Sequence, residues 1–336
     1  MPLQVLLVED SSGDLRLTQE AFHEVNPLIQ LHVAADGVEA MAFLRREGAQ
    51  AQAPRPDLIL LDLNLPKMDG REVLAHIKED KTLQTIPTLV LTSSAAESDV
   101  VRSYELRANC YLSKPMQFEA FHDLVKSIND FWLTQVKLPQ RDKAEPREAV
   151  SLLPPVEGAA GSSCPDSSSR DRGHLSALGA QVMQAIGGGG MPIQVLLVED
   201  SPGDVRLTQE AFHDANTSIC LHVANDGVEA MAFLRHEGVH VNAPRPDLIL
   251  LDLNLPRMDG REVLAHIKDD DGLKTIPTVI LTTSDAEVDI VKSYQLQANC
   301  YLTKPVQLDS FENLVKSIND FWLTKVKLPQ QKEQGG

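Results

Sequence analysis

The twelve residues RPDLILLDLNLP at positions 55–66 recur without a change at positions 245–256. In both places a continuous apolar run leads directly into an aspartate, Asp62 in the first copy and Asp252 in the second. A short apolar run without polar alternation is typical of a strand that is covered on both faces, as in the parallel sheets of α/β proteins. The stretch therefore predicts a parallel sheet with an acidic residue at the carboxyl end of one strand.

The rest of the sequence repeats with the same offset. QVLLVED at positions 4–10 recurs at 194–200, and the offset holds without insertion or deletion up to Gln140 and Gln330. A repeat of this length indicates a duplicated domain rather than a solenoid. The residues between the copies are rich in Pro, Ser, Gly and Ala, which is typical of a flexible linker. We predict domains at 1–140 and 191–330, a flexible linker at 141–190, and a tail at 331–336.

Composition excludes several classes of protein. The net charge of the 336 residues is −17, and no basic patch of the kind that binds nucleic acid is visible. No apolar run has the length of a membrane span, and the N-terminus lacks the basic region of a signal peptide, so we expect a cytoplasmic protein. The four cysteines form no C-x-x-C pair, and we expect Cys110 and Cys300 to be small buried hydrophobes.

Within each copy, short apolar runs alternate with amphipathic stretches. The strands expected in the first copy are Val5–Val8, Leu31–Ala34, Asp57–Leu61, Thr88–Leu91 and Cys110–Leu112, and the final helix is expected to carry one apolar stripe from Phe118 to Trp132. Five such units predict a parallel sheet with helices on both faces. Ligands of these sheets bind at the carboxyl ends of the strands.

Polar side chains stand at or close to four of those ends. In the first copy they are Glu9, Asp10, Asp62, Thr92 and Lys114. Crowded carboxylates repel one another unless a cation joins them, and hard oxygen ligands suit Mg²⁺. Asp62 can then act as a nucleophile toward phosphorus, while Lys114 and Thr92 bind the charge that develops on the phosphoryl oxygens. Asn64 would present its backbone carbonyl to the metal.

Each of these residues also has an ordinary explanation when taken alone. Glu9 and Asp10 would suit a polar loop that caps a helix, Asp62 a loop carboxylate, and Lys114 a surface charge. The presence of the whole set at strand ends in both copies favours a functional site.

Four sequence blocks carry a resemblance to a known family: VED, LDLNLPxMDG, LTSS or LTTS, and YLxKP. Through them each copy resembles a response-regulator receiver domain of two-component signalling over nearly its full length. The resemblance implies a flavodoxin-like, doubly wound (βα)5 fold with strand order 2-1-3-4-5. It also implies a phosphorelay in which a histidine kinase phosphorylates Asp62 and Asp252, and a cis peptide bond between Lys114 and Pro115.

The site residues that the resemblance implies fall into three groups. The phosphoryl-binding set is Asp62, Asp252, Thr92, Thr282, Lys114 and Lys304, and the switch aromatics are Tyr111 and Tyr301. The Mg²⁺ set is Glu9, Asp10, Asp62 and Asn64 in the first copy and Glu199, Asp200, Asp252 and Asn254 in the second. Phosphorylation is expected to draw Thr92 toward the phosphoryl group and to let Tyr111 turn inward. This would alter the face formed by the fourth helix, the fifth strand and the fifth helix.

A narrower resemblance concerns VEDSPGDVRLTQEAF at 198–212 and NDFWLTKVKLP at 319–329. These stretches are similar to the small receivers that partner bacterial phytochrome kinases and pair through their last helices. We therefore expect homotypic receiver pairing, within or between chains, through Phe131, Trp132, Phe321 and Trp322. The alternative is that these aromatics pack only on their own domain.

No DNA-binding or catalytic output module is visible, so we expect no enzyme activity beyond the phosphorylation and autodephosphorylation of the receivers themselves. Two rival functions are less well supported. An interaction scaffold that is never phosphorylated does not explain the intact acceptor, acid pair, threonine and lysine in both copies. A phosphatase that uses Asp62 as its nucleophile would need a second acid two residues on, where Asn64 stands. One difference between the copies stands next to the switch threonine, where Ser93 corresponds to Thr283. The larger side chain predicts a longer-lived phosphoryl group in the second copy.

Overall fold

The structure, a computed structural model, describes residues 2–140, 192–214 and 218–330. The predicted linker at 141–190 and the tail at 331–336 lie outside these residues. Each copy contains one five-stranded sheet with helices on both sides.

The sheet of the first copy is entirely parallel. Its strands are β1 (Gln4–Val8), β2 (Gln30–Ala34), β3 (Leu58–Leu61), β4 (Thr88–Thr92) and β5 (Cys110–Ser113). They lie in the order β2-β1-β3-β4-β5, so the direction of winding changes between β1 and β3. Val8 pairs with Leu61 at the ends of these two strands, which sets the residues that follow them side by side.

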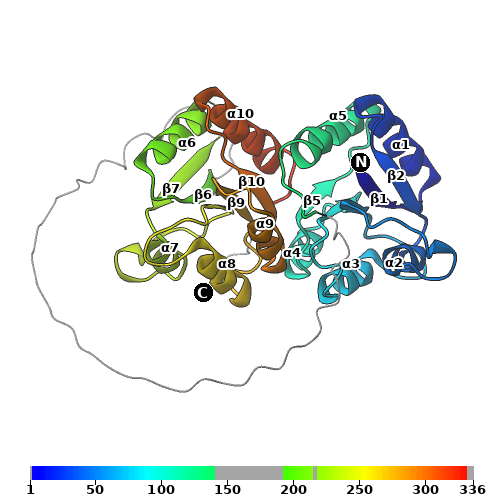
Figure 1. The fold of residues 1–336 in the computed structure, drawn as a ribbon, viewed down its shortest axis with the longest axis horizontal. Helices are drawn as coiled ribbons and strands as arrows, with labels where there is room; N and C mark the ends of the chain where they lie inside the picture. Colours follow the sequence, from blue (N-terminus) through cyan, green and yellow to red (C-terminus); the bar gives the residue numbers. More distant parts are fainter. Residues whose placement is uncertain (1, 141–191, 215–217, 331–336) are drawn as a thin grey trace, which may run out of the picture. The chain divides into compact units, whose positions relative to one another are not determined.

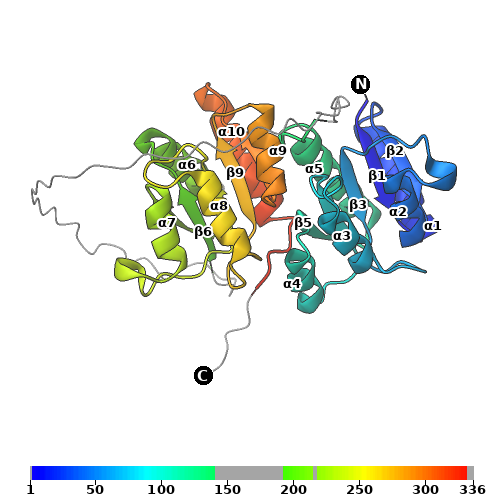
Figure 2. The same cartoon turned by 60° about the horizontal axis from the view of Figure 1, so that its bottom comes forward.

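Five helices cover this sheet. They are α1 (Ser12–Val25), α2 (Gly37–Arg45), α3 (Gly70–Glu79), α4 (Glu97–Glu105) and α5 (Phe118–Ile128), with a short 3-10 helix η1 (Gly48–Gln50). Helices α1 and α5 cover one face, and α2, α3 and α4 cover the other (Figures 1 and 2).

The second copy repeats this arrangement. Its strands are β6 (Ile193–Val198), β7 (Ile219–Ala224), β8 (Leu248–Leu251), β9 (Thr278–Thr282) and β10 (Cys300–Thr303), in the order β7-β6-β8-β9-β10. Its helices are α6 (Pro202–Asp214), α7 (Gly227–Leu234), α8 (Gly260–Asp269), α9 (Glu287–Gln295) and α10 (Leu308–Ile318), with η3 (Gly238–His240). The predicted fold class and strand order are therefore confirmed in both copies.

The apolar runs are explained by burial on both faces of the sheet. Val5 and Leu7 of β1 belong to the core beneath α1 and α5, whereas Leu6 and Val8 belong to the core beneath α2, α3 and α4. Because successive side chains of a strand point to opposite faces, the inner positions of such a strand are apolar on both sides. Cys110 and Cys300 are fully buried in the same cores, as predicted.

The final helix differs from the prediction of one continuous stripe. α5 ends at Ile128 and continues as a π-helical turn, η2 (Asn129–Leu133), and the second copy has the matching turn η4 (Asn319–Leu323). A π turn shifts the helical phase, so neighbouring residues can face the same side. Phe131 and Trp132 are consequently both buried.

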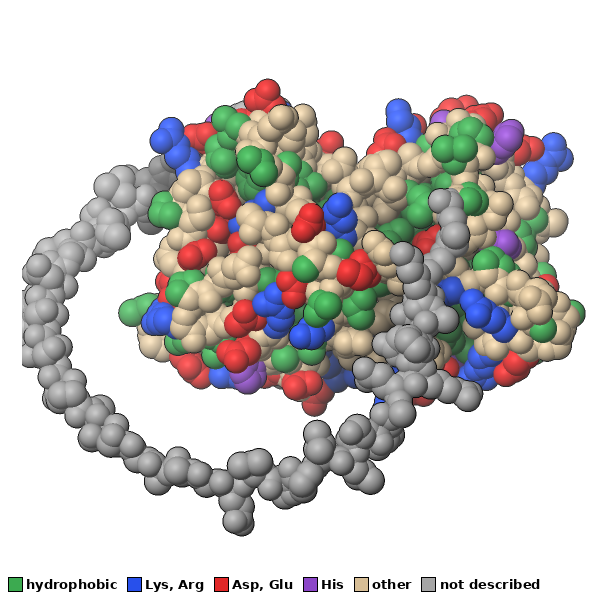
Figure 3. Space-filling model, viewed as in Figure 1, with side chains coloured by type: hydrophobic (Ala, Val, Ile, Leu, Met, Phe, Trp, Pro, Cys, Tyr) green, Lys and Arg blue, Asp and Glu red, His purple; other side chains and the backbone are tan. Residues whose placement is uncertain are grey.

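The charged side chains are distributed over the surface. On the face drawn in Figure 3, acidic and basic side chains are interspersed. Across the described parts of the chain, no helix has both the length and the apolar character needed to span a membrane.

Candidate functional site

The two predicted acceptor aspartates are buried at the ends of their strands. Asp62 directly follows β3, and its backbone N–H donates to the carbonyl oxygen of Val8 on β1 at 3.0 Å. Its Oδ1 accepts the N–H of Asn64 at 3.1 Å, and the rest of the side chain is covered, with 6% of the residue exposed. Asp252 has the same environment, with 5% exposed.

A glycine brings α3 close to this aspartate. A Cβ atom on Gly70 would lie 2.1 Å from the carbonyl oxygen of Asp62, so another residue there would force the backbone apart. Glycine at this position therefore allows the helix to begin against the acceptor.

The predicted lysines contact the acceptors directly. Lys114 follows β5, and its backbone N–H donates to the carbonyl of Thr92 at 2.8 Å. Its ammonium donates to Asp62 Oδ2 at 2.5 Å and to Glu9 Oε2 at 2.5 Å. A third contact, to Asp14 Oδ2 at 3.0 Å, was not predicted from the sequence.

Lys304 makes the same three contacts in the second copy. Its ammonium lies 2.6 Å from Asp252 and 2.9 Å from Asp204, and it also bonds Glu199. Burial disfavours the charged ammonium, but the interactions with these acidic groups outweigh burial and raise the pKa of Lys304 above its ordinary value. The same balance raises the pKa of Lys114.

The acidic residues after β1 have different surroundings. Glu9 is buried, and desolvation raises its pKa although Lys114 opposes that effect. Asp10, its neighbour, is exposed. Lys114 thus contacts Glu9, whereas Asp10 is exposed after β1, the strand next to β3.

The carboxylates fit a hard divalent cation. Among the residues that the structure describes, no three His, Cys, Asp or Glu side chains form a complete metal site. Mg²⁺ does not require one, because it commonly binds one or two carboxylates together with waters and phosphate oxygens. Asp10 and Asp62 supply two such oxygens at the ends of adjacent strands, so the donor set fits Mg²⁺.

The predicted switch residues are both buried. Thr92 ends β4, and its Oγ1 accepts the N–H of Ser94 over a long 3.5 Å. Tyr111 already lies inward, and its hydroxyl donates to the Ser94 carbonyl at 2.9 Å. Burial raises the pKa of its counterpart Tyr301 to about 12.

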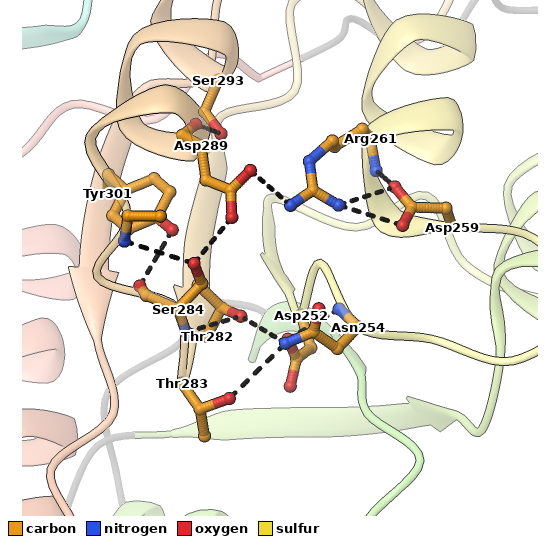
Figure 4. A network of polar contacts seen from close by, with 11 residues as sticks. Asp252, Asn254, Asp259, Arg261, Thr282, Thr283, Ser284, Asp289, Ser293 and Tyr301 are labelled. Atoms are coloured by element: carbon orange, nitrogen blue, oxygen red, sulfur yellow. Dashed lines mark hydrogen bonds and ion pairs between the residues drawn. The ribbon is translucent and has the colours of Figure 1, made fainter.

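A polar network connects the switch residues to α8, and Figure 4 shows it in the second copy. Arg261 lies between two carboxylates: it bonds Asp289 at 2.6 Å and both oxygens of Asp259 at 3.0 and 3.2 Å. The other oxygen of Asp289 accepts the hydroxyl of Ser284 at 2.6 Å. The Ser284 carbonyl in turn accepts the Tyr301 hydroxyl at 3.0 Å.

The first copy contains the same network. Its members are Arg71, Asp69, Asp99, Ser94 and Tyr111. The hydrogen bond from Ser94, followed by that from Arg71, lowers the pKa of Asp99 below its ordinary value, so this carboxylate is firmly charged. Sequence analysis did not identify this network, because its members lie on three separate elements.

The two copies differ at the predicted position beside the switch threonine. The side-chain amide of Asn254 donates to Thr283 Oγ1 at 3.4 Å and to Thr282 Oγ1 at 3.5 Å (Figure 4). Thr283 therefore lies next to the mouth of the second site, where Ser93 stands in the first copy.

The prediction of a cis peptide bond between Lys114 and Pro115 is wrong. The described residues contain no cis peptide bond. The trans form is the lower-energy state of an X-Pro bond, and in this form Lys114 still reaches all three of its carboxylates.

Replacing Arg71 by Gln should lower the free energy of unfolding by about 1–2 kcal/mol, because the half-buried pair with Asp99 loses a charge-assisted hydrogen bond. The matched control is Arg102→Gln, which breaks an exposed pair with Glu105 on α4 and should cost less than about 0.5 kcal/mol. Urea unfolding of the full chain measures both. Equal losses would show that the network carries no special stability.

Comparison with known proteins agrees with this geometry. The response regulator receiver domain family matches residues 5–126 and 195–316. Response regulator Rcp1 from Synechocystis sp. is 52% identical over 138 residues, which cover 41% of this chain and 94% of Rcp1.

Two solved structures are also similar to a single copy. The phosphorylated cyanobacterial phytochrome response regulator RcpA is 49% identical, with a TM-score of 0.41, and covers 42% of this chain and 100% of its own. The Mn²⁺-bound form of Rcp1 is 50% identical, with a TM-score of 0.40, and covers 41% of this chain and 100% of its own. The family match spans both copies, so the chain belongs to the response regulator receiver domain family and carries two receiver domains in tandem.

Proposed function

We propose that Asp62 and Asp252 each accept a phosphoryl group from a histidine kinase. One observation carries this proposal. In both copies a buried aspartate at a strand end is bonded by a buried lysine ammonium. This pairing places a cation beside the carboxylate, where phosphoryl oxygens would arrive.

In the proposed reaction, an oxygen of the Asp62 carboxylate forms a bond to phosphorus while the P–N bond to the donor histidine breaks, and the imidazole keeps the electron pair. Lys114 and the Thr92 hydroxyl each bind a phosphoryl oxygen. Asp10, Asp62 and the Asn64 carbonyl would hold Mg²⁺, with Glu9 assisting, and the ion would neutralise phosphoryl charge. The corresponding residues of the second copy are Thr282, Lys304, Glu199, Asp200 and Asn254.

The polar network supports a route from this chemistry to the surface. Thr92 holds Ser94 only through a long hydrogen bond, and Ser94 also bonds Tyr111 and Asp99. A Thr92 hydroxyl that turns toward a phosphoryl oxygen would release Ser94. The proposed result is a changed face at α4, β5 and α5, and at α9, β10 and α10 in the second copy.

The proposed donor is a kinase of the phytochrome type. The support is the 49% identity to a phytochrome response regulator, together with the stretches at 198–212 and 319–329.

Incubation with acetyl phosphate and Mg²⁺ tests the acceptors. Intact-mass spectrometry should find up to two phosphoryl groups on the unchanged chain, one on Asp62→Asn or Asp252→Asn, and none on the double variant. Glu20→Gln, an exposed change on α1, is the matched control and should keep both groups. A chain that takes no label is a scaffold, and one that hydrolyses unrelated phosphomonoesters is a phosphatase; either result refutes the proposal.

The phosphoryl group on Asp252 should outlast that on Asp62 by roughly two- to tenfold, about 0.4–1.4 kcal/mol in the barrier, because Thr283 narrows the path of attacking water. Decay is followed in the two single-acceptor chains by intact mass. Thr283→Ser should shorten the lifetime on Asp252, and Ser93→Thr should lengthen that on Asp62. Val288→Ser, an exposed difference on α9, should change neither. Equal decay on the two aspartates would contradict this prediction.

We also propose that the receivers at 1–140 and 191–330, joined by 141–190, pair within one chain. The contacts that support this pairing are reciprocal, as in a two-fold interface. The Phe131 and Phe321 rings stack with centroids 4.6 Å apart. The side-chain amide of Asn109 donates to the Asn299 carbonyl at 2.9 Å, and the reverse bond measures 3.0 Å.

The segment after each final helix takes part in the same pairing. The N–H of Lys137 donates to the Tyr301 carbonyl at 2.8 Å, and that of Lys327 donates to the Tyr111 carbonyl at 2.9 Å. Trp132 and Trp322 are buried beside the stacked rings. Because the segment bonds the strand that carries the switch tyrosine, the pairing would involve the output face.

Replacing Asn109 and Asn299 by Asp should open the pair without unfolding either receiver. Asp removes the amide donor but keeps the oxygen that binds Lys78 or Lys268. Light scattering should give the one-chain mass of 36.9 kDa for the unchanged protein, and X-ray scattering should give a larger radius of gyration for the double variant. Asn242→Asp, at an exposed position, is the control. A two-chain mass for the unchanged protein, or an unchanged radius for the variant, would argue against pairing within the chain.

A further inference from the structure

Each site contains a carboxylate that does not come from a strand end. Asp14 lies in the first turn of α1, and Asp204 occupies the same place on α6. Their Oδ2 atoms lie 3.0 and 2.9 Å from the ammonium nitrogens of Lys114 and Lys304. The contact is therefore present in both copies.

The lysine has no further N–H to give. An ammonium group has three donors, and in the first copy they go to Glu9, Asp62 and Asp14. One of these N–H groups is donated to Asp14. A phosphoryl group on Asp62 that binds the lysine must therefore compete with Asp14 for an N–H.

Asp14 differs from the other two partners in its exposure. The Glu9 and Asp62 side chains are 2% and 7% exposed, whereas that of Asp14 is 38% exposed. The helix fixes its backbone, since the Ser11 hydroxyl accepts its N–H and its carbonyl accepts the Thr18 hydroxyl. Asp14 is thus a fixed negative charge on the solvent side of the lysine.

We propose that Asp14 and Asp204 are positioning residues that hold the lysine by one N–H and slow phosphoryl uptake by competing for that N–H. This inference rests on the proposed function and names a further determinant of its rate. With acetyl phosphate, the Asp62 oxygen forms a bond to phosphorus, the bond between phosphorus and the acetate oxygen breaks, and acetate leaves. The lysine must turn an N–H toward the phosphoryl oxygens during this step, and the charge of Asp14 opposes both that turn and the approach of an anionic donor.

The effect of the Asp14 charge on phosphoryl uptake is tested with Asp14→Asn. The chain also carries Asp252→Asn, so that Asp62 is its only acceptor. The amide oxygen can still bind the lysine, but the negative charge is gone. Uptake from acetyl phosphate, followed by intact mass, should rise about three- to tenfold. The increase should be smaller with phosphoramidate, which carries less negative charge. Asp204→Asn in the Asp62→Asn chain should behave in the same way.

Glu20→Gln is the matched control because it removes one carboxylate from α1 without contact to the lysine. Its rate should stay within about twofold of the unchanged chain, since charges at an exposed site are screened. Thermal unfolding followed by circular dichroism should show that the variants remain folded.

The contact between Asp14 and Lys114 can also be tested by lysine acetylation, which needs neither metal nor phosphodonor. Acetic anhydride should modify Lys114 faster in Asp14→Ala than in Asp14→Asn, as measured by peptide mass spectrometry, because only Ala removes the covering oxygen. A structural role alone would not make the rate depend on donor charge. Equal uptake by Asp14→Asn and Glu20→Gln, or an equal increase with both donors, would overturn the inference. No uptake by the chain that keeps Asp14 would instead refute the proposed function, and this inference with it.

Discussion

The buried lysine ammonium and the carboxylates around it form the interaction on which each site depends. Buried carboxylates repel one another, and burial together with the nearby charge of Asp62 raises the pKa of Glu9. Lys114 offsets this cost by giving one N–H to each of three acidic side chains. The sheet places Glu9, Asp62 and Lys114 at the ends of β1, β3 and β5, which meet at one edge because the strands are parallel, and α1 supplies Asp14. The doubly wound order is therefore a requirement of the site as well as a packing solution.

Sequence analysis identified the strands and their terminal residues because burial on both faces removes every polar residue except those at the ends. It did not identify Asp14, since an acidic residue in the first turn of a helix is expected for helix stability alone. It also missed the pair of Arg71 with Asp99, whose partners belong to different helices. The π-helical turn was not predicted, because an apolar stripe in the sequence does not show where the number of residues per helical turn changes. The cis bond before Pro115 was inferred from resemblance rather than from the local chain, and it was wrong.

The duplication allows the contacts of one copy to be compared with those of the other. The lysine contacts, the arginine network and the glycine at the start of the third helix occur in both copies, so each contact is found in two separate sets of residues. Differences occur in the core, where Leu89 and Val90 correspond to Val279 and Ile280, and at the rim, where Ser93 corresponds to Thr283 and the exposed Met116 to Val306. The polar contacts of the two sites are thus the same, whereas residues at their rims differ.

Ser94 connects the chemistry to the surface because three different groups depend on its position. Its N–H reaches Thr92 weakly, its carbonyl accepts the hydroxyl of Tyr111, and its own hydroxyl bonds Asp99. The bond to Thr92 is the longest of the three, so a rotation of the Thr92 side chain breaks it more easily than the other two. The shorter bonds to Tyr111 and Asp99 then move with Ser94 rather than break. Ser94 therefore joins the end of β4 to both α4, through Asp99, and β5, through Tyr111.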